Sequence, residues 1–416
     1  MVYNRTKFIS PTNVDASKAH CLEAGLEGLL EFSKAPSIKD ILCMLQICRK
    51  TKNVASAKLL YSYICGQGLL DDRSFGNHLI PLFVDCGSLQ DAKMVFSSLS
   101  YRNEHSWTSL ILGYARSEQI LHAFCLYQRM QENSILPTSY TLVGLLQSCA
   151  QLQNSEFGQE IHLEVVQKGF DVDLFIHSAL IDMYVKCGSI LDAQNVFDRM
   201  SNRDVVLWTT LIAGYAEHGP VEDALKSFEK MQDEGILPNT FSFSCVLKAC
   251  GKTEAIDEGH GMHMHITYKG FEKDFFLGKS IVSMYVKCGA LSDAWGVFIK
   301  LPVQDVVSWT SLLVGYTDDG PSEEAFNCFK EMQMQGILPD AFSFSNILRA
   351  CSNAGSIEKG FEIHKEIIHE GFEKDLVVGS ALISMYVLCG SFVEAQEVFD
   401  ELPRHCVVAW NALIGG

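Results

Sequence analysis

Three features are missing from this sequence, and each absence excludes a class of protein or site. The chain has no excess of positive charge, because 33 Lys and Arg oppose 50 Asp and Glu and give a formal net charge of −17 at pH 7. Proteins that hold nucleic acid mainly by neutralising phosphates are usually basic, so any nucleic-acid binding here must be local and directed largely at bases. No apolar run approaches the roughly 18 residues of a membrane span, so no membrane partner is expected.

The third missing feature is a C-x-x-C pair, although the chain has 15 cysteines. Eight of these cysteines occupy two repeated positions instead. The first position holds Cys48, Cys149, Cys250 and Cys351, and the second holds Cys86, Cys187, Cys288 and Cys389. Cysteine is a small and readily buried residue, so we expect reduced, buried thiols in a reducing compartment rather than disulfides or metal ligands.

Histidines and H-x-E triplets suggest metal chemistry at first sight. Of His260, His263 and His265 only His263 recurs, as His162 and His364, and the spacing puts just two of the three on one helix face, so we expect packing residues and no metal. The triplets that begin at His162 and His364 lack the P-C-x-x-C segment that a zinc deaminase needs. No phosphate loop or hydrolase elbow occurs either. We therefore expect no catalytic site and no cofactor.

A period of 101 residues runs through the whole chain. Trp107 returns as Trp208, Trp309 and Trp410, and each period divides into units of 31, 35 and 35 residues. A fixed spacing held over such a length indicates an array of similar units. One unit cannot bury both its faces, so neighbours must stack. The sequence therefore predicts an all-α fold, an α-solenoid of tandem helix-turn-helix repeats.

The helices of one unit can be placed from unit 205–239. Its first helix is expected from about Val206 to Glu217, ending at Gly219 in a left-handed cap position, with Pro220 in the first turn of the second helix. One apolar face of the second helix is then formed by Ala224, Leu225, Phe228 and Met231. Small residues recur at the Ala224 position, and the Gly-Ile-Leu-Pro segments at 235–238 and 336–339 end the second helix.

Without linkers, the units divide the chain as follows. Residues 1–37 are expected to be a leader with a degenerate repeat, and 407–416 a truncated repeat. Eleven repeats lie between them: 38–72, 73–103, 104–138, 139–173, 174–204, 205–239, 240–274, 275–305, 306–340, 341–375 and 376–406.

Tandem 35-residue units that end in GILPN or GILPD, alternating with 31-residue units that carry MYVKCGS, resemble pentatricopeptide repeat (PPR) proteins of the PLS subgroup of land plants. The resemblance covers residues 38–416. It implies a right-handed superhelix that binds single-stranded organellar RNA sequence-specifically, about one base per repeat. The PLS pattern is tied to C-to-U editing in this family. The resemblance thus implies a site-recognition factor in RNA processing that is not itself an enzyme.

The same resemblance supplies partners and a location. Beyond the RNA, a deaminase or editing accessory proteins acting in trans are candidate partners, and a longer form could carry a deaminase domain. The family is located in the mitochondrion or chloroplast. The first ten residues contain Arg5 and Lys7 and no acid, which is a weak transit signal.

In the family, the fifth and last residues of a unit choose the base. Transferred here, Asn77 with Asn103 resembles a pyrimidine reader, and Thr209 with Asn239 the adenine combination. Two pairs resemble the guanine combination: Ser178 with Asp204 and Thr310 with Asp340. Three pairs depart from the pattern: Thr108 with Thr138, Lys279 with Asp305 and Ser380 with Cys406; long units such as 240–274 follow it poorly, and Asn411 lacks a partner. The implied target is a pyrimidine, two unread positions, G, A, two unread positions and G.

Two further sets of residues are implied to contact RNA. Second-position residues clamp the base from either side, here Phe175, Val206, Phe276, Val307, Val377 and Val408. Thirteenth-position lysines near the phosphate are Lys186 and Lys287. Without the family, the second-position residues are explained as helix-packing apolars, and fifth-position Thr and Ser as ordinary helix-surface residues.

A helical-repeat scaffold that binds protein with the same surface is the alternative function. The acidic charge suits it well. We expect the fifth-and-last pattern to discriminate between the two, because a scaffold has no evident reason to confine Asn, Ser and Thr to one position and Asp or Asn to another.

Overall fold

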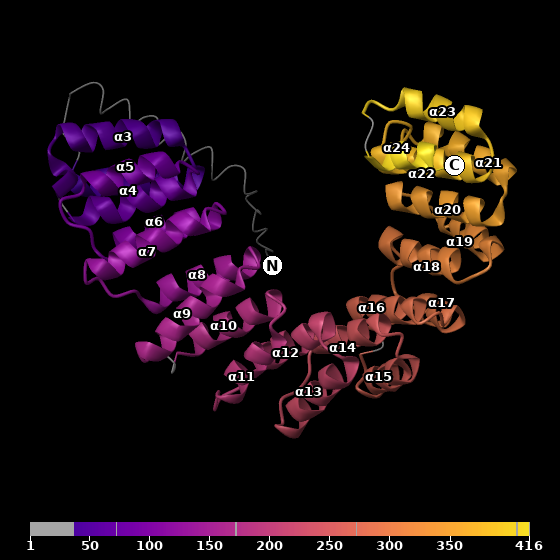
Figure 1. Ribbon diagram of the computed structural model, residues 1–416, viewed down its shortest axis with the longest axis horizontal. Helices are drawn as coiled ribbons and strands as arrows, with labels where there is room; N and C mark the ends of the chain where they lie inside the picture. Colours follow the sequence, from indigo (N-terminus) through magenta and orange to yellow (C-terminus); the bar gives the residue numbers. More distant parts are fainter. Residues whose placement is uncertain (1–36, 72, 171–172, 272, 405–406, 416) are drawn as a thin grey trace, which may run out of the picture. The chain divides into compact units, whose positions relative to one another are not determined.

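The computed structural model of the chain describes residues 37–71, 73–170, 173–271, 273–404 and 407–415. Within these ranges the backbone forms α-helices and one short 3-10 turn, η1 (Leu69–Asp71), and no strand is found (Figure 1). The predicted all-α fold is therefore confirmed. The expected leader lies outside the described residues except for Ser37, which caps the first described helix.

The described helices divide between two compact units, and the first of these is Met1–Met200. Helices α2, α4, α6, α8 and α10 form one layer, in which each helix packs against the next, and each also packs against the helix that follows it in the chain. The bounds in this unit are α2 (Ile38–Thr51), α3 (Val54–Gly66), α4 (Arg73–Asp85), α5 (Leu89–Ser98), α6 (Glu104–Arg116), α7 (Ile120–Glu132), α8 (Ser139–Gln151), α9 (Ser155–Gln167), α10 (Leu174–Lys186) and α11 (Ile190–Asp198).

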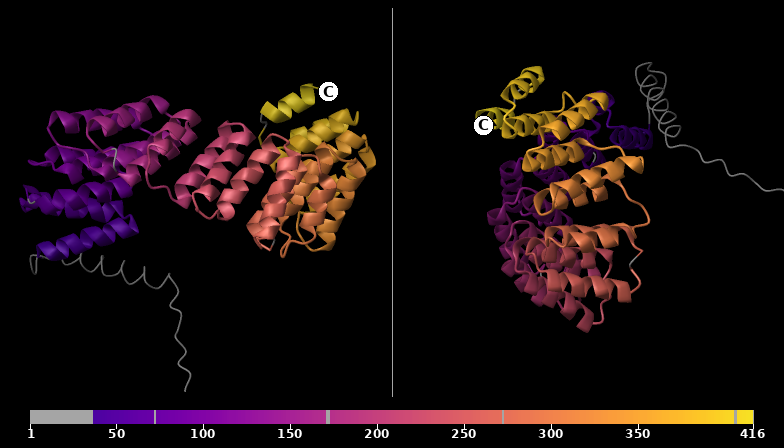
Figure 2. Two further views of the ribbon diagram at one scale, coloured as in Figure 1. Left: turned by 90° about the horizontal axis from the view of Figure 1, so that it is seen from below. Right: turned by 90° about the vertical axis from the view of Figure 1, so that its right-hand side faces the viewer.

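The second compact unit, Ser201–Gly416, repeats this two-layer arrangement (Figure 2). Each even-numbered helix packs against the next even-numbered one and against its own odd-numbered partner. The bounds are α12 (Val205–His218), α13 (Val221–Asp233), α14 (Thr240–Lys252), α15 (Ile256–Tyr268), α16 (Phe275–Lys287), α17 (Leu291–Phe298), α18 (Val306–Asp318), α19 (Ser322–Met334), α20 (Ala341–Ala354), α21 (Ile357–His369), α22 (Leu376–Leu388), α23 (Phe392–Glu401) and α24 (Val407–Ile414). Together with the first unit, this stacking confirms the predicted α-solenoid.

The connection between α12 and α13 differs from its prediction at two residues. Gly219 caps α12 with φ −113° and ψ −179°, an extended conformation, so the expected left-handed cap there is wrong. Pro220 is the N-cap residue of α13 and lies just before the first turn rather than in it. The two errors have one cause, because the residue that precedes a proline is pushed into extended backbone. The left-handed glycine of this unit is Gly235, with φ 76°, in the predicted Gly-Ile-Leu-Pro turn.

Small and aromatic side chains fill the space between the layers. Leu225 on the predicted apolar face of α13 is only half-buried, whereas the other three residues of that face are buried. The repeated alanines are fully buried, which lets paired helices approach closely: Ala123, Ala193, Ala224, Ala294, Ala325 and Ala395. The repeated tryptophans Trp107, Trp309 and Trp410 pack edge-on against a phenylalanine of the preceding helix, as in Phe298 and Trp309, whose ring centroids are 4.6 Å apart.

The two repeated cysteine positions differ in burial. Cys149 and its equivalents are fully buried, and burial raises the pKa of Cys149 to about 12, so this thiol stays protonated. Cys288 and its equivalents are only half-buried, so the expected burial is wrong at this second position. Several of them, including Cys288, cap a first helix at its C-terminus, where the chain leaves the packed layer. The thirteen cysteines that the structure describes are all free.

The recurring histidine lies within hydrogen-bond distance of the recurring tyrosine of the following helix. Nδ1 of His162, His263 and His364 lies 2.8, 2.9 and 2.7 Å from the hydroxyl oxygen of Tyr184, Tyr285 and Tyr386 respectively. Burial lowers the pKa of each of these histidines. They therefore serve as neutral packing residues that link a long unit to the short unit after it. None of the described helices is both long and apolar enough to cross a membrane.

Trp208→Ala should lower the free energy of unfolding by about 3–5 kcal/mol. Trp208 is 3% exposed, so its removal leaves a cavity in the core. Trp410 occupies the same repeat position but is 47% exposed, so Trp410→Ala is the matched control and should cost far less. Urea unfolding followed by circular dichroism measures both. Equal losses for the two variants would contradict this account of the core.

Candidate nucleic-acid interface

Outside unit 73–103, the second residue of each repeat projects from a first helix into solvent. Phe175 and Phe276 are 80% and 70% exposed, and the four valines proposed as clamps, Val206, Val307, Val377 and Val408, are at least half exposed. An apolar side chain that packs between helices would be buried. Their explanation as packing residues is therefore contradicted.

Three further aromatic side chains lie at the same position. Tyr140, Phe241 and Phe342 are the second residues of three of the four long units, and all are exposed. Sequence reasoning missed them because it compared only the short and standard units. Taking the second position of every unit would have found them. At two places in the chain, a long unit and the short unit after it thus both present an exposed ring, Tyr140 with Phe175 and Phe241 with Phe276.

The last residue of a repeat is the N-cap of the next first helix. The backbone N–H of Ser242 donates to Asn239 Oδ1 (2.9 Å), and that of Ser343 donates to Asp340 Oδ1 (2.8 Å). The same bond is made by Asn103, Thr138, Asp204 and Asp305. Capping favours Asp, Asn, Ser and Thr, so it explains these residue types without any ligand. The last position alone therefore does not discriminate an RNA binder from a scaffold.

In the standard units, the fifth residue bonds to the third residue of the following unit. The hydroxyl oxygens of Thr108 and Thr141 are 2.7 Å apart. The corresponding oxygens of Thr209 and Ser242, and those of Thr310 and Ser343, are 2.8 Å apart. Thr108 is buried, whereas Thr209 and Thr310 are half-buried.

The third residue also bonds to the last residue of the preceding unit. The hydroxyl of Ser242 donates to Asn239 Oδ1 (3.0 Å), and that of Ser343 donates to Asp340 Oδ1 (2.8 Å). The hydroxyl oxygens of Thr138 and Thr141 are 3.1 Å apart. The fifth and last residues of each standard unit are thus brought together through one intervening hydroxyl.

The remaining fifth residues are placed differently. The hydroxyls of Ser178 and Ser380 donate to carbonyls of their own helices at 2.8 and 2.7 Å. Asn77 Oδ1 is buried and has no hydrogen-bond partner among the described residues. Asn411 is exposed on α24, and Cys406, the expected partner of Ser380, lies outside the described residues.

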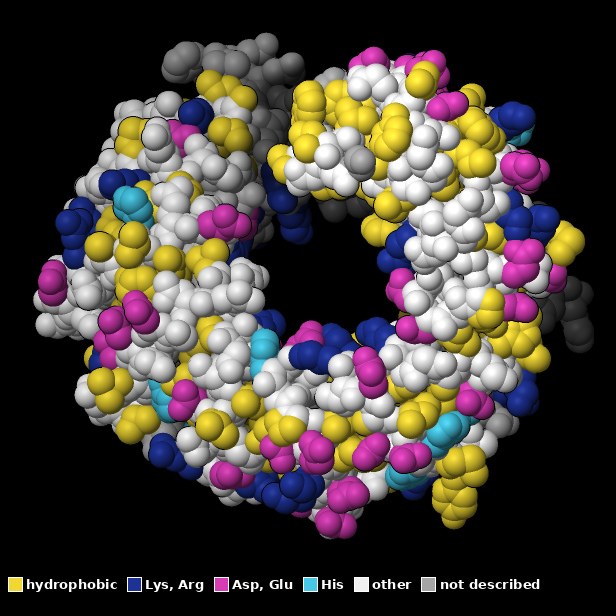
Figure 3. Space-filling view, turned by 45° about the vertical axis from the view of Figure 1, so that its right-hand side comes forward, with side chains coloured by type: hydrophobic (Ala, Val, Ile, Leu, Met, Phe, Trp, Pro, Cys, Tyr) yellow, Lys and Arg dark blue, Asp and Glu magenta, His cyan; other side chains and the backbone are white. Residues whose placement is uncertain are grey.

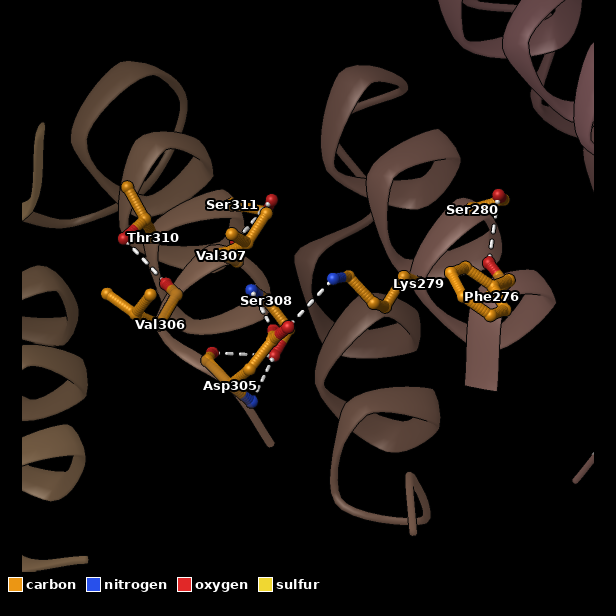
Figure 4. A network of polar contacts seen from close by, with 9 residues as sticks. All are labelled: Phe276, Lys279, Ser280, Asp305, Val306, Val307, Ser308, Thr310 and Ser311. Carbon is orange, nitrogen blue, oxygen red and sulfur yellow. Dashed lines mark hydrogen bonds and ion pairs between the residues drawn. The ribbon is translucent and has the colours of Figure 1, made fainter. Parts of the chain in front are cut away.

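In unit 275–305 the fifth and last residues form a direct ion pair. Lys279 Nζ lies 2.9 Å from Asp305 Oδ2, as Figure 4 shows, and 4.9 Å from the centre of the Phe275 ring. Burial alone would raise the pKa of Asp305, but hydrogen bonds from Lys279 and Ser308 outweigh it and lower the pKa below its usual value. The carboxylate and the ammonium are thus occupied by each other.

A cavity of about 590 Å³ lies between α14 and α16. The exposed rings of Phe241 and Phe276 line it, together with Asn239, Thr240, Ser244, Asp274, Lys279 and Ser280. Ser244 and Ser280 are hydrogen-bonded at 3.1 Å. Exposed rings are stacking surfaces for a flat aromatic group, and the polar groups that line the cavity offer both donors and acceptors.

Charges near this surface are mixed in sign. Figure 3 shows one face of the molecule, on which exposed hydrophobic side chains lie among acidic and basic ones. Lys186 is paired with Asp182 (2.8 Å) and Lys248 with Glu217 (2.6 Å). Lys287 is exposed, and no ion pair to it is found in the described part of the chain. Of the two lysines predicted to contact phosphate, Lys287 is the one without a carboxylate partner there.

Comparisons with known proteins identify similar sequences over most of the chain. A model of the PPR repeat family matches residues 102–151, 203–252 and 304–353, and a PPR repeat model matches 175–205, 342–372 and 380–407; together they cover more than half of the chain. Two similar proteins of Arabidopsis thaliana are "Pentatricopeptide repeat-containing protein At4g18520, chloroplastic" (33% identical, covering 90% of this chain and 61% of that one) and "Pentatricopeptide repeat-containing protein At3g09040, mitochondrial" (34% identical, 88% and 36%). The chain thus spans between about a third and two thirds of the length of these relatives.

Among solved structures, the chain is similar to the crystal structure of the pentatricopeptide repeat protein PPR10 in complex with an 18-nt psaJ RNA element. The TM-score is 0.70 at 16% identity, and the match covers 96% of this chain and 65% of that one. At this identity the likeness shows the fold.

Proposed function

The chain belongs to the pentatricopeptide repeat family, and from this premise we propose that it binds single-stranded RNA sequence-specifically, about one base per repeat. PPR10, which shares its fold, was crystallised with an RNA element. Single-stranded RNA is recognised by stacking splayed bases on aromatic side chains and by hydrogen bonds to base edges. Both kinds of group lie along the first helices of this chain.

The observation that carries the proposal is the cavity between Phe241 and Phe276. Two large apolar rings are exposed by 74% and 70%, although Phe276 also meets the neighbouring Phe275 edge-on at 5.7 Å, and leaving so much ring surface in water is unfavourable. A base between them would bury both rings. Stacking of a base on an aromatic side chain contributes roughly 1–3 kcal/mol.

The fifth and last residues are proposed to choose the bases. Asn239 with Thr209 is assigned to adenine and Asp340 with Thr310 to guanine, and each pair is held close by a shared hydroxyl. The remaining assignments follow the family resemblance alone, a pyrimidine for unit 73–103 and guanine for unit 174–204. Lys287 is the better candidate for a phosphate contact, because Lys186 already has Asp182 as its partner.

We further assign the chain to the PLS subgroup, with the eleven repeats between residues 38 and 406. Within these units the described helices come in pairs, and the units alternate in length as that subgroup does. The proposed process is C-to-U editing of organellar transcripts, with a deaminase or accessory proteins in trans. Relatives named chloroplastic and mitochondrial support an organellar location of either kind.

One observation favours the protein-binding scaffold as a second candidate. Helix capping accounts for Asp and Asn at the last position, which removes half of the pattern that favoured RNA. The exposed second-position rings remain unexplained by capping, and protein partners also use exposed aromatic side chains. RNA selection separates the two functions.

The chain should enrich a defined motif from a randomised single-stranded RNA pool at near-physiological salt. We expect G-A followed by two unconstrained bases and G, as the pairs in units 174–204, 205–239 and 306–340 imply. The same pool made as DNA should be bound more weakly. A folded chain that enriches no motif and captures no RNA contradicts the proposed function.

Thr209→Asn should change the preferred base at a single position. It creates an Asn–Asn pair like Asn77 with Asn103, so adenine should give way to a pyrimidine, with a change in preference of roughly tenfold for one altered set of base hydrogen bonds. Binding to RNAs that differ at this base measures it. Thr210→Asn, the same change on the neighbouring residue, is the matched control and should leave the preference intact. If both variants weaken binding equally for all RNAs, the assignment is wrong.

Phe241→Ala should weaken binding without altering base order. The loss of one stacking face should reduce affinity roughly 5- to 150-fold for every RNA tested. Because the ring is exposed, the melting temperature should hardly change. Leu237→Ala removes a side chain that is 79% exposed in the turn before α14 and serves as the control. An unchanged affinity for Phe241→Ala would show that the cavity does not receive a base.

A further inference from the structure

We propose that the third residue of the repeat after a standard unit is a positioning residue for the base-reading pair, and that it determines which hydrogen-bonding groups the pair presents. The residues are Thr141, Ser242 and Ser343. This inference rests on the proposed function. It goes beyond the fifth and last residues, because it assigns specificity to a residue of the following repeat that does not itself face the base.

The geometry places this third residue between the two base-reading side chains. Ser242 Oγ is 2.8 Å from Thr209 Oγ1 and 3.0 Å from Asn239 Oδ1, and Ser242 is fully buried. In the other unit, Ser343 Oγ lies 2.8 Å from both Thr310 Oγ1 and Asp340 Oδ1 and is equally buried. No solvent competes for these hydroxyls, so their protons stay within the network.

Counting protons fixes the direction of each bond around Ser242. A serine hydroxyl has one proton, and Ser242 donates it to Asn239 Oδ1, so the contact with Thr209 requires Thr209 to donate. Thr209 then keeps only an acceptor lone pair. Asn239 Oδ1 already accepts from both the N–H and the hydroxyl of Ser242, which orients the amide so that Nδ2 is the group left to donate.

The pair in unit 205–239 therefore presents one acceptor and one donor. The Watson–Crick edge of adenine carries an amino donor and the N1 acceptor, which match this order. A fixed donor and acceptor order discriminates adenine and cytosine, which share it, from guanine and uracil, because a base with the opposite order would leave polar groups unpaired.

The same network with Asp340 presents two acceptors. Asp340 Oδ1 accepts from the N–H and hydroxyl of Ser343, so Oδ2 remains as an acceptor. The proton of Thr310 is used either on Val306 O (2.7 Å) or on Ser343, so Thr310 too keeps only an acceptor. Guanine offers N1–H and its amino group on the matching edge. One buried hydroxyl thus serves both base choices, and the last residue decides between them.

The long units lack this hydroxyl. Their following third residues, Ile176, Leu277 and Val378, are apolar and fully buried. In unit 240–274 the hydroxyl of Ser244 consequently bonds to Ser280 and Asp274 caps α16 without a shared hydroxyl. This difference gives a physical reason for the poor fit of the long units to the family code: their fifth and last residues are not locked to each other.

The test is Ser242→Ala in the full chain, assayed with four RNAs that differ only at the base facing unit 205–239. The loss of the hydroxyl removes the acceptor of the Thr209 proton and one of the two donors to Asn239 Oδ1. The backbone N–H of residue 242 still donates to Asn239 Oδ1, so the helix cap remains. Preference for adenine over guanine and uracil should fall about 3- to 10-fold, the equivalent of one net hydrogen bond. Binding at the base facing unit 306–340 should keep its preference for guanine.

Two variants control for a purely structural role. Ser242→Thr keeps the hydroxyl, as Thr141 does naturally, and should retain the adenine preference within about twofold. Thr210→Ala removes a hydroxyl that bonds only to Val206 O (2.9 Å) and should also retain it. Ser343→Ala repeats the test for guanine, so an unstable Ser242 variant, identified by its melting temperature, does not end the experiment.

The outcomes separate the inference from the proposed function. If the unaltered chain prefers adenine and both Ser→Ala variants keep their preferences, or weaken all four RNAs equally, the positioning role is overturned and the proposed function stands. If the unaltered chain shows no base preference at either position, the base-reading function and this inference fall together. Selective loss in the Ser→Ala variants with retention in Ser242→Thr supports the inference.

Discussion

The array depends on the hydrogen bond by which the last side chain of one repeat caps the first helix of the next. Four N–H groups at a helix start have no intrahelical partner, and a capping side chain satisfies one of them at a gain of about 1 kcal/mol. Asn239 caps α14 and Asp340 caps α20, so the residue proposed to read a base is also the residue that caps the next helix at its N-terminus. Helix capping restricts the last position of a repeat to a few polar residue types, chiefly Asp, Asn, Ser and Thr. RNA recognition can therefore act only on the choice among these residue types.

The sequence could predict the repeated features of the structure but not the local ones. The 101-residue period located the helix pairs, because buried positions such as Ala224 and Trp208 recur with the units. The period does not reveal local steric effects. The proline after Gly219 holds that glycine in an extended conformation, although glycine after a helix usually adopts the left-handed one. The half-burial of Cys288 could not be predicted either, since repetition alone does not distinguish a core position from a helix end.

The candidate site was likewise predicted only in part. The family resemblance pointed to the second and fifth positions, but the hydroxyls of Ser242 and Ser343 belong to the following repeat and carry no signal within their own unit. The aromatic partner of Phe276 was missed for a related reason, because Phe241 lies in a long unit. Residues that act across a repeat boundary are found only when neighbouring units are compared. On the proposed function, the base-reading groups of this solenoid lie at these boundaries.

The acidic charge of the chain constrains how such a surface can hold RNA. Screening at physiological salt limits charge effects to about 8 Å, so a phosphate senses nearby lysines more than the net charge. Exposed ion pairs such as Lys186 with Asp182 contribute about 0–1 kcal/mol, so exchanging the carboxylate for a phosphate costs and gains little. Stacking, at roughly 1–3 kcal/mol per base, is the larger contribution. Affinity that comes from bases rather than phosphates is lost when the bases are wrong, and on the proposed function this makes an acidic solenoid more discriminating than a basic one of equal affinity.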